Sequence, residues 1–237
     1  MQNLRSRNKE HSASIVVSQA NANISHHYDE KYFEWQTQDG GAEFGAQANL
    51  WMYRDYVGPN DIVVDFGCGG GFLLEALPAR EKIGVEVNPA AQHFLRQRGR
   101  TVVSDLSEIP DEHADVIISC HALEHTFDPF EKLKQVRAKL RHRGLAVFVV
   151  PCERYDTAYV ESNIDQHLYT WAPINIGNLF RATGFSVLSC ERSAHRVPPR
   201  AAQVQQLVGW KAFHALCRAY GRLSPRLTQV RVVANRI

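Results

Sequence analysis

The residues best suited to chemistry form a glycine-rich turn after a short apolar run. Residues 62–64 lead to Asp65, and the turn that follows contains Gly67, Cys68, Gly69, Gly70 and Gly71. Glycines let a backbone approach a ligand closely and point its N–H groups toward that ligand. Phe72 stands where a dinucleotide-binding turn needs a small residue, and no Gly-Lys-Ser/Thr follows, so neither NAD nor a nucleoside triphosphate suits this turn.

Strand and helix patterns alternate around the turn. Helical segments include one that begins at Asn88-Pro89 and is closed by Gly99, and one from about residue 129 to residue 140. The strand-length apolar segments between them are 62–65, 82–87, 101–104, 115–119 and 145–151. Strands separated by helices form a parallel sheet with helices on both faces.

The pattern changes after residue 151. An irregular segment, 152–172, precedes a helix at 173–184 and a strand at 185–193, and the chain ends in a strand at 228–237. We expect these two strands to form an antiparallel hairpin at the sheet edge, because the sixth strand is the only partner available near the seventh. The predicted fold is therefore α/β, a doubly wound, mostly parallel seven-stranded sheet with an antiparallel terminal hairpin.

Two further segments surround this sheet. Residues 28–57 carry many aromatic side chains and are split by Gly40-Gly41, which predicts N-terminal helices that cover the sheet. Residues 195–226 lie between the last two strands and predict a helical cap. We expect residues 1–24, which are polar and aperiodic, to be a flexible leader, and residues 25–237 to form a single domain.

The glycine turn resembles the first motif of the S-adenosylmethionine-dependent methyltransferases of the seven-stranded class I fold. That motif reads acid-x-Gly-x-Gly-x-Gly, and the resemblance covers about residues 61–190. It implies S-adenosyl-L-methionine as cofactor. The resemblance places Glu86 at the ribose, where the two carboxylate oxygens can accept hydrogen bonds from both hydroxyls, and Asp105 at the adenine amino group. The expected cofactor-binding residues are Tyr32, Asp65, Gly67, Cys68, Gly69, Glu86, Val87, Asp105, Leu106 and His121.

Three histidines are candidate catalytic residues. Methyl transfer is an in-line displacement in which a hydroxyl acceptor must lose its proton, and a histidine suits that task. His121 and His125 lie in CHALEH, which resembles the family's fourth motif beside the reactive sulfonium and implies that Glu124 is also near the cofactor. His167 lies in the irregular segment. The alternative for each histidine is a hydrogen-bonded structural role.

The C-terminal part of the chain is basic. Residues 195–237 contain eight Lys and Arg residues and no acid, although the whole chain carries a net charge of only +2. Such a region attracts phosphate in a substrate, an acidic lipid surface or nucleic acid, or it is a solvated face. The cap would form a partly apolar lid with a basic rim from Leu207, Trp210, Phe213, Leu216, Leu223, Arg218 and Arg222.

We therefore expect the methyl acceptor to be a small molecule. The leading candidate is a hydroxyl of a sugar or related metabolite that is phosphorylated or glycan-linked. Peripheral membrane contact through the basic region is a further expectation. An RNA methyltransferase is the alternative enzyme, but nucleic acid is not favoured, because no RNA-binding module is visible and residues 119–122 lack the Asn-Pro-Pro-Tyr/Phe motif of amino-methylating enzymes. A non-catalytic S-adenosylmethionine-binding regulatory protein is the other alternative, and the intact motif acids and glycines argue against it.

The cysteines and apolar runs indicate the compartment. The five cysteines are far apart and form no Cys-x-x-Cys pair, so a zinc ribbon, a redox motif and a disulfide framework are disfavoured, and we expect no metal. The apolar runs are too short to span a membrane, and the N-terminus has no signal-peptide core. These features predict a cytoplasmic protein with free thiols.

Overall fold

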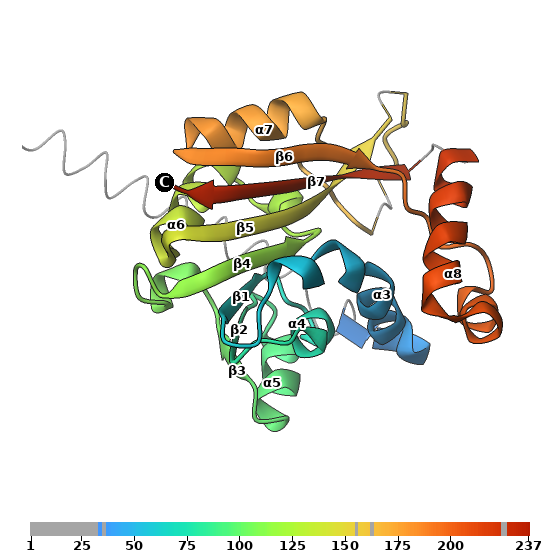
Figure 1. The fold of residues 1–237 in the computed structure, drawn as a ribbon, viewed down its shortest axis with the longest axis horizontal. Helices are drawn as coiled ribbons and strands as arrows, with labels where there is room; N and C mark the ends of the chain where they lie inside the picture. Colours follow the sequence, from blue (N-terminus) through green and yellow to red (C-terminus); the bar gives the residue numbers. More distant parts are fainter. Residues whose placement is uncertain (1–32, 35–36, 155, 162–163, 224–226) are drawn as a thin grey trace, which may run out of the picture.

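A single seven-stranded sheet forms the centre of the molecule (Figure 1). The computed structural model describes residues 33–34, 37–154, 156–161, 164–223 and 227–237, so the expected leader at 1–24 and the candidate Tyr32 lie outside the described residues. The strand order is β3-β2-β1-β4-β5-β7-β6. The strands are β1 Ile62–Phe66, β2 Glu81–Val85, β3 Thr101–Val103, β4 Ala114–Cys120, β5 Leu140–Glu153, β6 Phe185–Ser193 and β7 Leu227–Arg236.

The first five strands are parallel, and β7 runs antiparallel to both of its neighbours. The predicted α/β class and the antiparallel pair of the last two strands are confirmed. The expectation that β7 has only β6 as a partner is wrong, because β7 also pairs with β5 along nine residue positions. Val232 and Val233 explain this placement: successive side chains on β7 are both buried, so the strand needs cover on both faces.

Helices cover both faces of the sheet (Figure 1). The α-helices are α3 Gly41–Asn49, α4 Phe72–Ala76, α5 Pro89–Gln97, α6 Pro129–Lys139, α7 Pro173–Ala182 and α8 Ala201–Leu223. Short 3-10 turns are η1 Gln38–Gly40, η2 Leu50–Met52, η3 Arg54–Tyr56, η4 Leu106–Glu108 and η5 Leu123–His125. The helix start predicted at Asn88-Pro89 is present, and the Asn88 side chain accepts a hydrogen bond from the Ala90 N–H.

Alternation along the strands divides the core into two layers. Val64, Ile117 and Phe148 belong to the layer that α6 and α7 complete. A residue adjacent to each of them along its strand packs in the other layer, with the residues just after α3 and with α4; these residues are Val63, Ile118 and Val149. The N-terminal segment therefore covers one face of the sheet, as its aromatic composition predicts. The sheet in turn holds the strand ends that carry the candidate site.

The cap helix α8 packs on α3 (Figure 1). Phe44 of α3 lies 5.6 Å from the ring of Trp210 and 5.7 Å from that of Phe213, and Phe213 is fully buried. The helical backbone is interrupted at Gly209, whose φ of 71° kinks α8. The N-terminal cover and the cap thus form one layer at the same end of the molecule.

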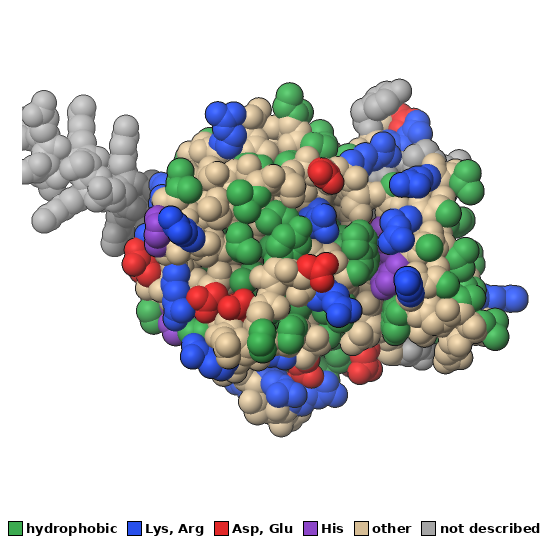
Figure 2. Space-filling view, viewed as in Figure 1, with side chains coloured by type: hydrophobic (Ala, Val, Ile, Leu, Met, Phe, Trp, Pro, Cys, Tyr) green, Lys and Arg blue, Asp and Glu red, His purple; other side chains and the backbone are tan. Residues whose placement is uncertain are grey.

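The outer surface of α8 differs from the predicted lid. Leu207 and Leu223 are 86% and 85% exposed, and Leu216 is also exposed, so these three side chains face solvent. Figure 2 shows hydrophobic side chains alongside Lys and Arg on this surface. Within the described part of the chain, every helix is too short or too polar to cross a membrane.

A buried histidine lies where the cap meets the N-terminal cover. His195 is 8% exposed and its ring lies 5.2 Å from that of Trp51. Its Nε2 atom is 3.4 Å from Nδ1 of His214. Burial, followed by the nearby His214 and Arg218, lowers the pKa of His195 to about 4.

Acidification should therefore lower the free energy of unfolding through His195. Between the ordinary histidine pKa near 6.5 and the folded value of about 4, the unfolded chain binds a proton that the folded chain does not, so stability falls as the pH falls through this window. Replacing His195 with Asn should reduce the loss of melting temperature between pH 7 and pH 5 by several degrees (about 2–4 °C per kcal/mol for a chain of this size). The exposed His142→Asn variant is the control, and an equal loss in both variants would contradict the assignment.

Candidate active site

The candidate site lies at the carboxyl edge of the sheet, where the first four strands end together. The N–H groups of Gly67 and Cys68 donate to the Val85 carbonyl at 2.9 and 3.1 Å, which ties the glycine turn to the end of β2. The N–H of Glu86 donates to the Val103 carbonyl at 3.0 Å, which ties the end of β2 to that of β3. This edge is where open α/β sheets bind ligands.

Steric contacts require glycine in the turn. Gly67 has a φ of +77°, and a Cβ atom there would collide with the Cβ of Ala122. Gly71 has a φ of +75°, and its Cβ would lie 2.6 Å from a methyl carbon of Leu95. The turn after β1 therefore packs directly against the turn after β4, which carries two of the three candidate histidines.

Glu86 is built into the glycine turn. Its Oε2 accepts a hydrogen bond from the Gly69 N–H at 2.7 Å, and its Oε1 accepts one from the Asn88 N–H at 2.8 Å. The side chain is buried, and burial raises its pKa although these N–H groups act in the opposite direction. Carboxylate oxygens have several acceptor positions, so Glu86 fits the ribose hydroxyls of S-adenosylmethionine as further donors.

Asp65 and its neighbours lie behind the turn. Asp65 is 2% exposed within β1, and desolvation, with the nearby Glu86 carboxylate as a second cause, raises its pKa to about 8. Cys68 is buried against Leu95 and Val102, and burial raises the pKa of its thiol. No disulfide joins any two of the five cysteines, all of which lie in the described part of the chain.

Three further expected cofactor-binding residues differ in how far their side chains are buried. Val87 is 46% exposed, whereas the Leu106 side chain is fully buried in the core. Asp105 caps η4, and its oxygens accept hydrogen bonds from the Ser107 N–H at 2.9 Å and from Nζ of Lys132 at 2.7 Å. Partial burial raises the Asp105 pKa, but the Lys132 and Ser107 hydrogen bonds outweigh it and hold the pKa at about 2.

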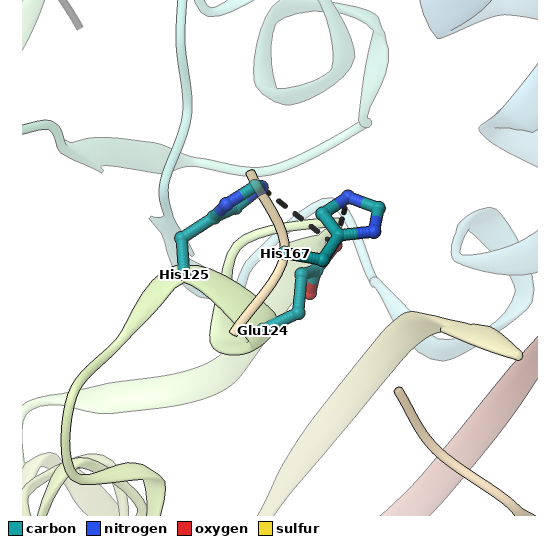
Figure 3. A group of neighbouring side chains, drawn as sticks. All are labelled: Glu124, His125 and His167. Atoms are coloured by element: carbon teal, nitrogen blue, oxygen red, sulfur yellow. Dashed lines mark ion pairs between the residues drawn. The ribbon is translucent and has the colours of Figure 1, made fainter. Parts of the chain in front are cut away.

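The three candidate histidines surround one buried carboxylate. Glu124 is fully buried, and neither of its oxygens accepts a hydrogen bond from the residues that the structure describes. Its Oε1 instead faces Nδ1 of His121 at 3.3 Å, Nε2 of His167 at 3.9 Å and Nε2 of His125 at 4.0 Å. Figure 3 shows the rings of His125 and His167 directed toward Glu124 from two different segments of the chain.

His121 is held in an uncommon backbone conformation. Its φ is 55°, in the left-handed region that few residues other than glycine adopt, while its N–H donates to the Val149 carbonyl at 2.9 Å. Its Nε2 lies 3.0 Å from Oε1 of Gln229 on β7. Burial lowers the His121 pKa, but Glu124 and Gln229 outweigh this effect, so the pKa is raised overall. Strain of this kind concentrates at functional sites.

The loop between β5 and α7 brings His167 to the cluster. Nδ1 of His167 lies 2.7 Å from Oε1 of Glu153, and the His167 and His125 rings are 4.9 Å apart. The Leu168 N–H donates to the Glu124 carbonyl at 3.0 Å, which fixes the loop to the turn after β4. Burial is the main cause that lowers the His125 pKa to about 4.

Sequence reasoning missed several supporting residues. Gln229 and Glu153 reach the histidines from β7 and from the end of β5, and Tyr53 donates from its hydroxyl to the Ser119 carbonyl at 3.0 Å. A polar residue at the start of an apolar strand was the available signal for Gln229. Placing Gln229 at the site from this signal requires knowing that β5 pairs with β7, and the sequence pattern did not predict that pairing.

The Glu86 arrangement generates a test of cofactor binding. Glu86→Gln should weaken S-adenosylmethionine binding at least about tenfold and Glu86→Ala about a hundredfold, because hydrogen bonds to a charged group contribute about 1.5–3 kcal/mol each. Isothermal titration calorimetry measures both. Glu131→Gln on the exposed surface of α6 is the control, and equal affinity in all four proteins would show that the ribose binds elsewhere.

Comparisons with known proteins identify the family of the chain. Residues 19–190 match a family model described as a methyltransferase domain. The chain is 32% identical over 83 residues to a ubiquinone biosynthesis O-methyltransferase of Hahella chejuensis, covering 30% of this chain and 35% of that protein. It is 28% identical over 144 residues to that of Aeromonas salmonicida, covering 54% of this chain and 52% of that protein. The chain thus spans about a third to a half of these curated relatives.

Solved structures share the fold. A SAM-dependent methyltransferase from Archaeoglobus fulgidus has a TM-score of 0.61 at 21% identity, with 86% of this chain and 99% of that chain covered. Geranyl diphosphate C-methyltransferase from Streptomyces coelicolor has a TM-score of 0.58 at 16% identity, with 81% and 76% covered. Because the family model covers more than half of the chain and the fold is shared, the chain belongs to the class I S-adenosylmethionine-dependent methyltransferases.

Proposed function

We propose that this protein transfers the methyl group of S-adenosylmethionine to a hydroxyl oxygen of a small organic acceptor. The observation that carries the proposal is the cluster of three imidazoles around the buried Glu124, next to the glycine turn. Because Gly67 packs against Ala122, a methyl donor held by the turn would lie beside this cluster. The cofactor supplies the methyl group on a sulfonium, and the chain's own residues bind and orient the acceptor.

The chemistry of the cluster favours oxygen as the accepting atom. A neutral hydroxyl is a weak nucleophile, and imidazole and carboxylate groups accept its proton as the new bond forms. Glu124 faces one nitrogen of His121 and Gln229 faces the other, so the acceptor hydroxyl would replace one of these two partners when His121 positions it. The curated relatives whose names specify O-methyl transfer support the same choice of atom.

The surroundings favour an acceptor with an apolar part. The loop after β5 exposes Tyr159, Val160 and Leu168. A phenol, or a sugar carried on an apolar or phosphorylated group, suits this environment together with the basic cap. The exposed leucines and basic residues of α8 would also bring the protein to an anionic lipid surface that holds such an acceptor.

An acceptor screen tests the proposal. We expect wild-type protein with methyl-deuterated S-adenosylmethionine to label at least one member of a panel of phenols, sugars and phosphorylated sugars, with the label found on oxygen by mass spectrometry. His121→Ala and His167→Ala should lower kcat about 10²- to 10⁴-fold, the range that general acid–base groups contribute. S-adenosylmethionine affinity should stay within about twofold in His167→Ala.

His142→Ala, at the opposite end of β5, is the matched control and should keep full activity. Labelling confined to nitrogen, carbon or RNA would contradict transfer to a small-molecule hydroxyl. Full activity in both His121→Ala and His167→Ala would contradict the role of the cluster.

A further inference from the structure

We propose that Glu124, His125 and His167 bind one divalent transition-metal ion at the carboxyl end of β4. The three side chains offer one carboxylate oxygen and two imidazole nitrogens, all within 4.8 Å of one another. Glu124 and His125 come from η5, while His167 comes from the loop after β5 (Figure 3). Two imidazoles and a carboxylate suit Zn²⁺, Co²⁺ or Fe²⁺ better than Mg²⁺ or Ca²⁺.

The donor spacing is close to that of a metal site. Nε2 of His167 and Nε2 of His125 lie 3.9 and 4.0 Å from Oε1 of Glu124. Ligands at about 2.0–2.2 Å from a metal are about 3–3.5 Å from one another. Each donor atom therefore needs to move inward by less than about 1 Å, which small side-chain rotations provide.

The orientation of His167 supports the same conclusion. Its Nδ1 is hydrogen-bonded to Glu153 at 2.7 Å, which leaves Nε2 pointing toward Glu124. Metal-bound histidines usually donate their other ring N–H to a carboxylate, which fixes the tautomer and makes the coordinating nitrogen more basic. Glu153 is thus a positioning residue for the proposed ligand.

Glu124 supplies an independent observation. Its two oxygens are buried and accept no hydrogen bond from the described residues. A buried carboxylate is costly unless it is paired or coordinates a metal. A cation between Glu124, His125 and His167 would bind this carboxylate directly, while His121 approaches the same oxygen at 3.3 Å and remains outside the ligand set.

Three protein ligands leave coordination positions open. An acceptor hydroxyl bound at one of these positions would lose its proton more readily, because a divalent metal lowers the pKa of bound oxygen ligands. This consequence rests on the proposed hydroxyl methylation and selects acceptors whose oxygen can coordinate a metal. The metal site itself does not depend on that function.

Metal binding is measured directly, without an acceptor. Chelator-treated full-length protein is titrated with Co²⁺, whose visible spectrum reports coordination, and with Zn²⁺ by calorimetry. We expect one equivalent to bind, without the thiolate charge-transfer absorption that cysteine ligands produce. His167→Ala and Glu124→Gln should each weaken binding by more than the roughly 10–100-fold that outer-shell partners contribute, and Glu153→Gln should fall within that range.

His93→Ala, exposed on α5, is the control for surface binding. Circular dichroism and S-adenosylmethionine affinity identify any variant that fails to fold, and His125→Ala then replaces it. Wild-type protein that binds no Co²⁺ or Zn²⁺, or binding that survives both His167→Ala and His125→Ala, would overturn the metal site. The labelled-methyl assay on the same samples separates this failure from failure of the proposed function. Methyl transfer by metal-free protein would refute only the role of the metal in deprotonating the acceptor, and the titrations alone decide whether the metal binds.

Discussion

The contact between the turn after β1 and the turn after β4 is the constraint on which the rest of the site depends. Gly67 has no room for a Cβ atom because Ala122 occupies that space. The two turns also connect through the core, where Ser119 donates from its hydroxyl to the Phe66 carbonyl at 2.9 Å. A cofactor held by one turn would therefore lie beside the side chains carried by the other.

The Glu124 cluster is the second constraint. A fully buried carboxylate with three imidazoles near one oxygen is a costly arrangement for stability alone, and partly satisfied polar networks of this kind mark functional sites. The supporting residues come from three strands: His121 follows β4, Glu153 ends β5 and Gln229 lies on β7. Insertion of β7 between β5 and β6 is what brings Gln229 within reach of His121.

Much of the fold could be predicted from the sequence because its signals are local. The Asn88-Pro89 helix start and the alternating segments each depend on neighbours in the chain, and the strands and helices appear near the expected residues. The partners of β7 could not be predicted in this way, since strand pairing depends on burial across the whole sheet. The outward direction of Leu207 and Leu223 was missed for a similar reason: α8 uses Phe213 and Cys217, not these leucines, to pack on α3.

The candidate site likewise has one part that local sequence signals predict and another that depends on long-range packing. His121, His125 and His167 could be named from residue type and from the family resemblance, but their meeting at Glu124 depends on the loop after β5, which has no periodic pattern. The most direct measurement is an experimental structure of the protein with S-adenosylhomocysteine. The account predicts both ribose hydroxyls on Glu86 and the cofactor sulfur facing the turn that carries His121 and Glu124. A cofactor bound with its sulfur away from that turn would contradict the account.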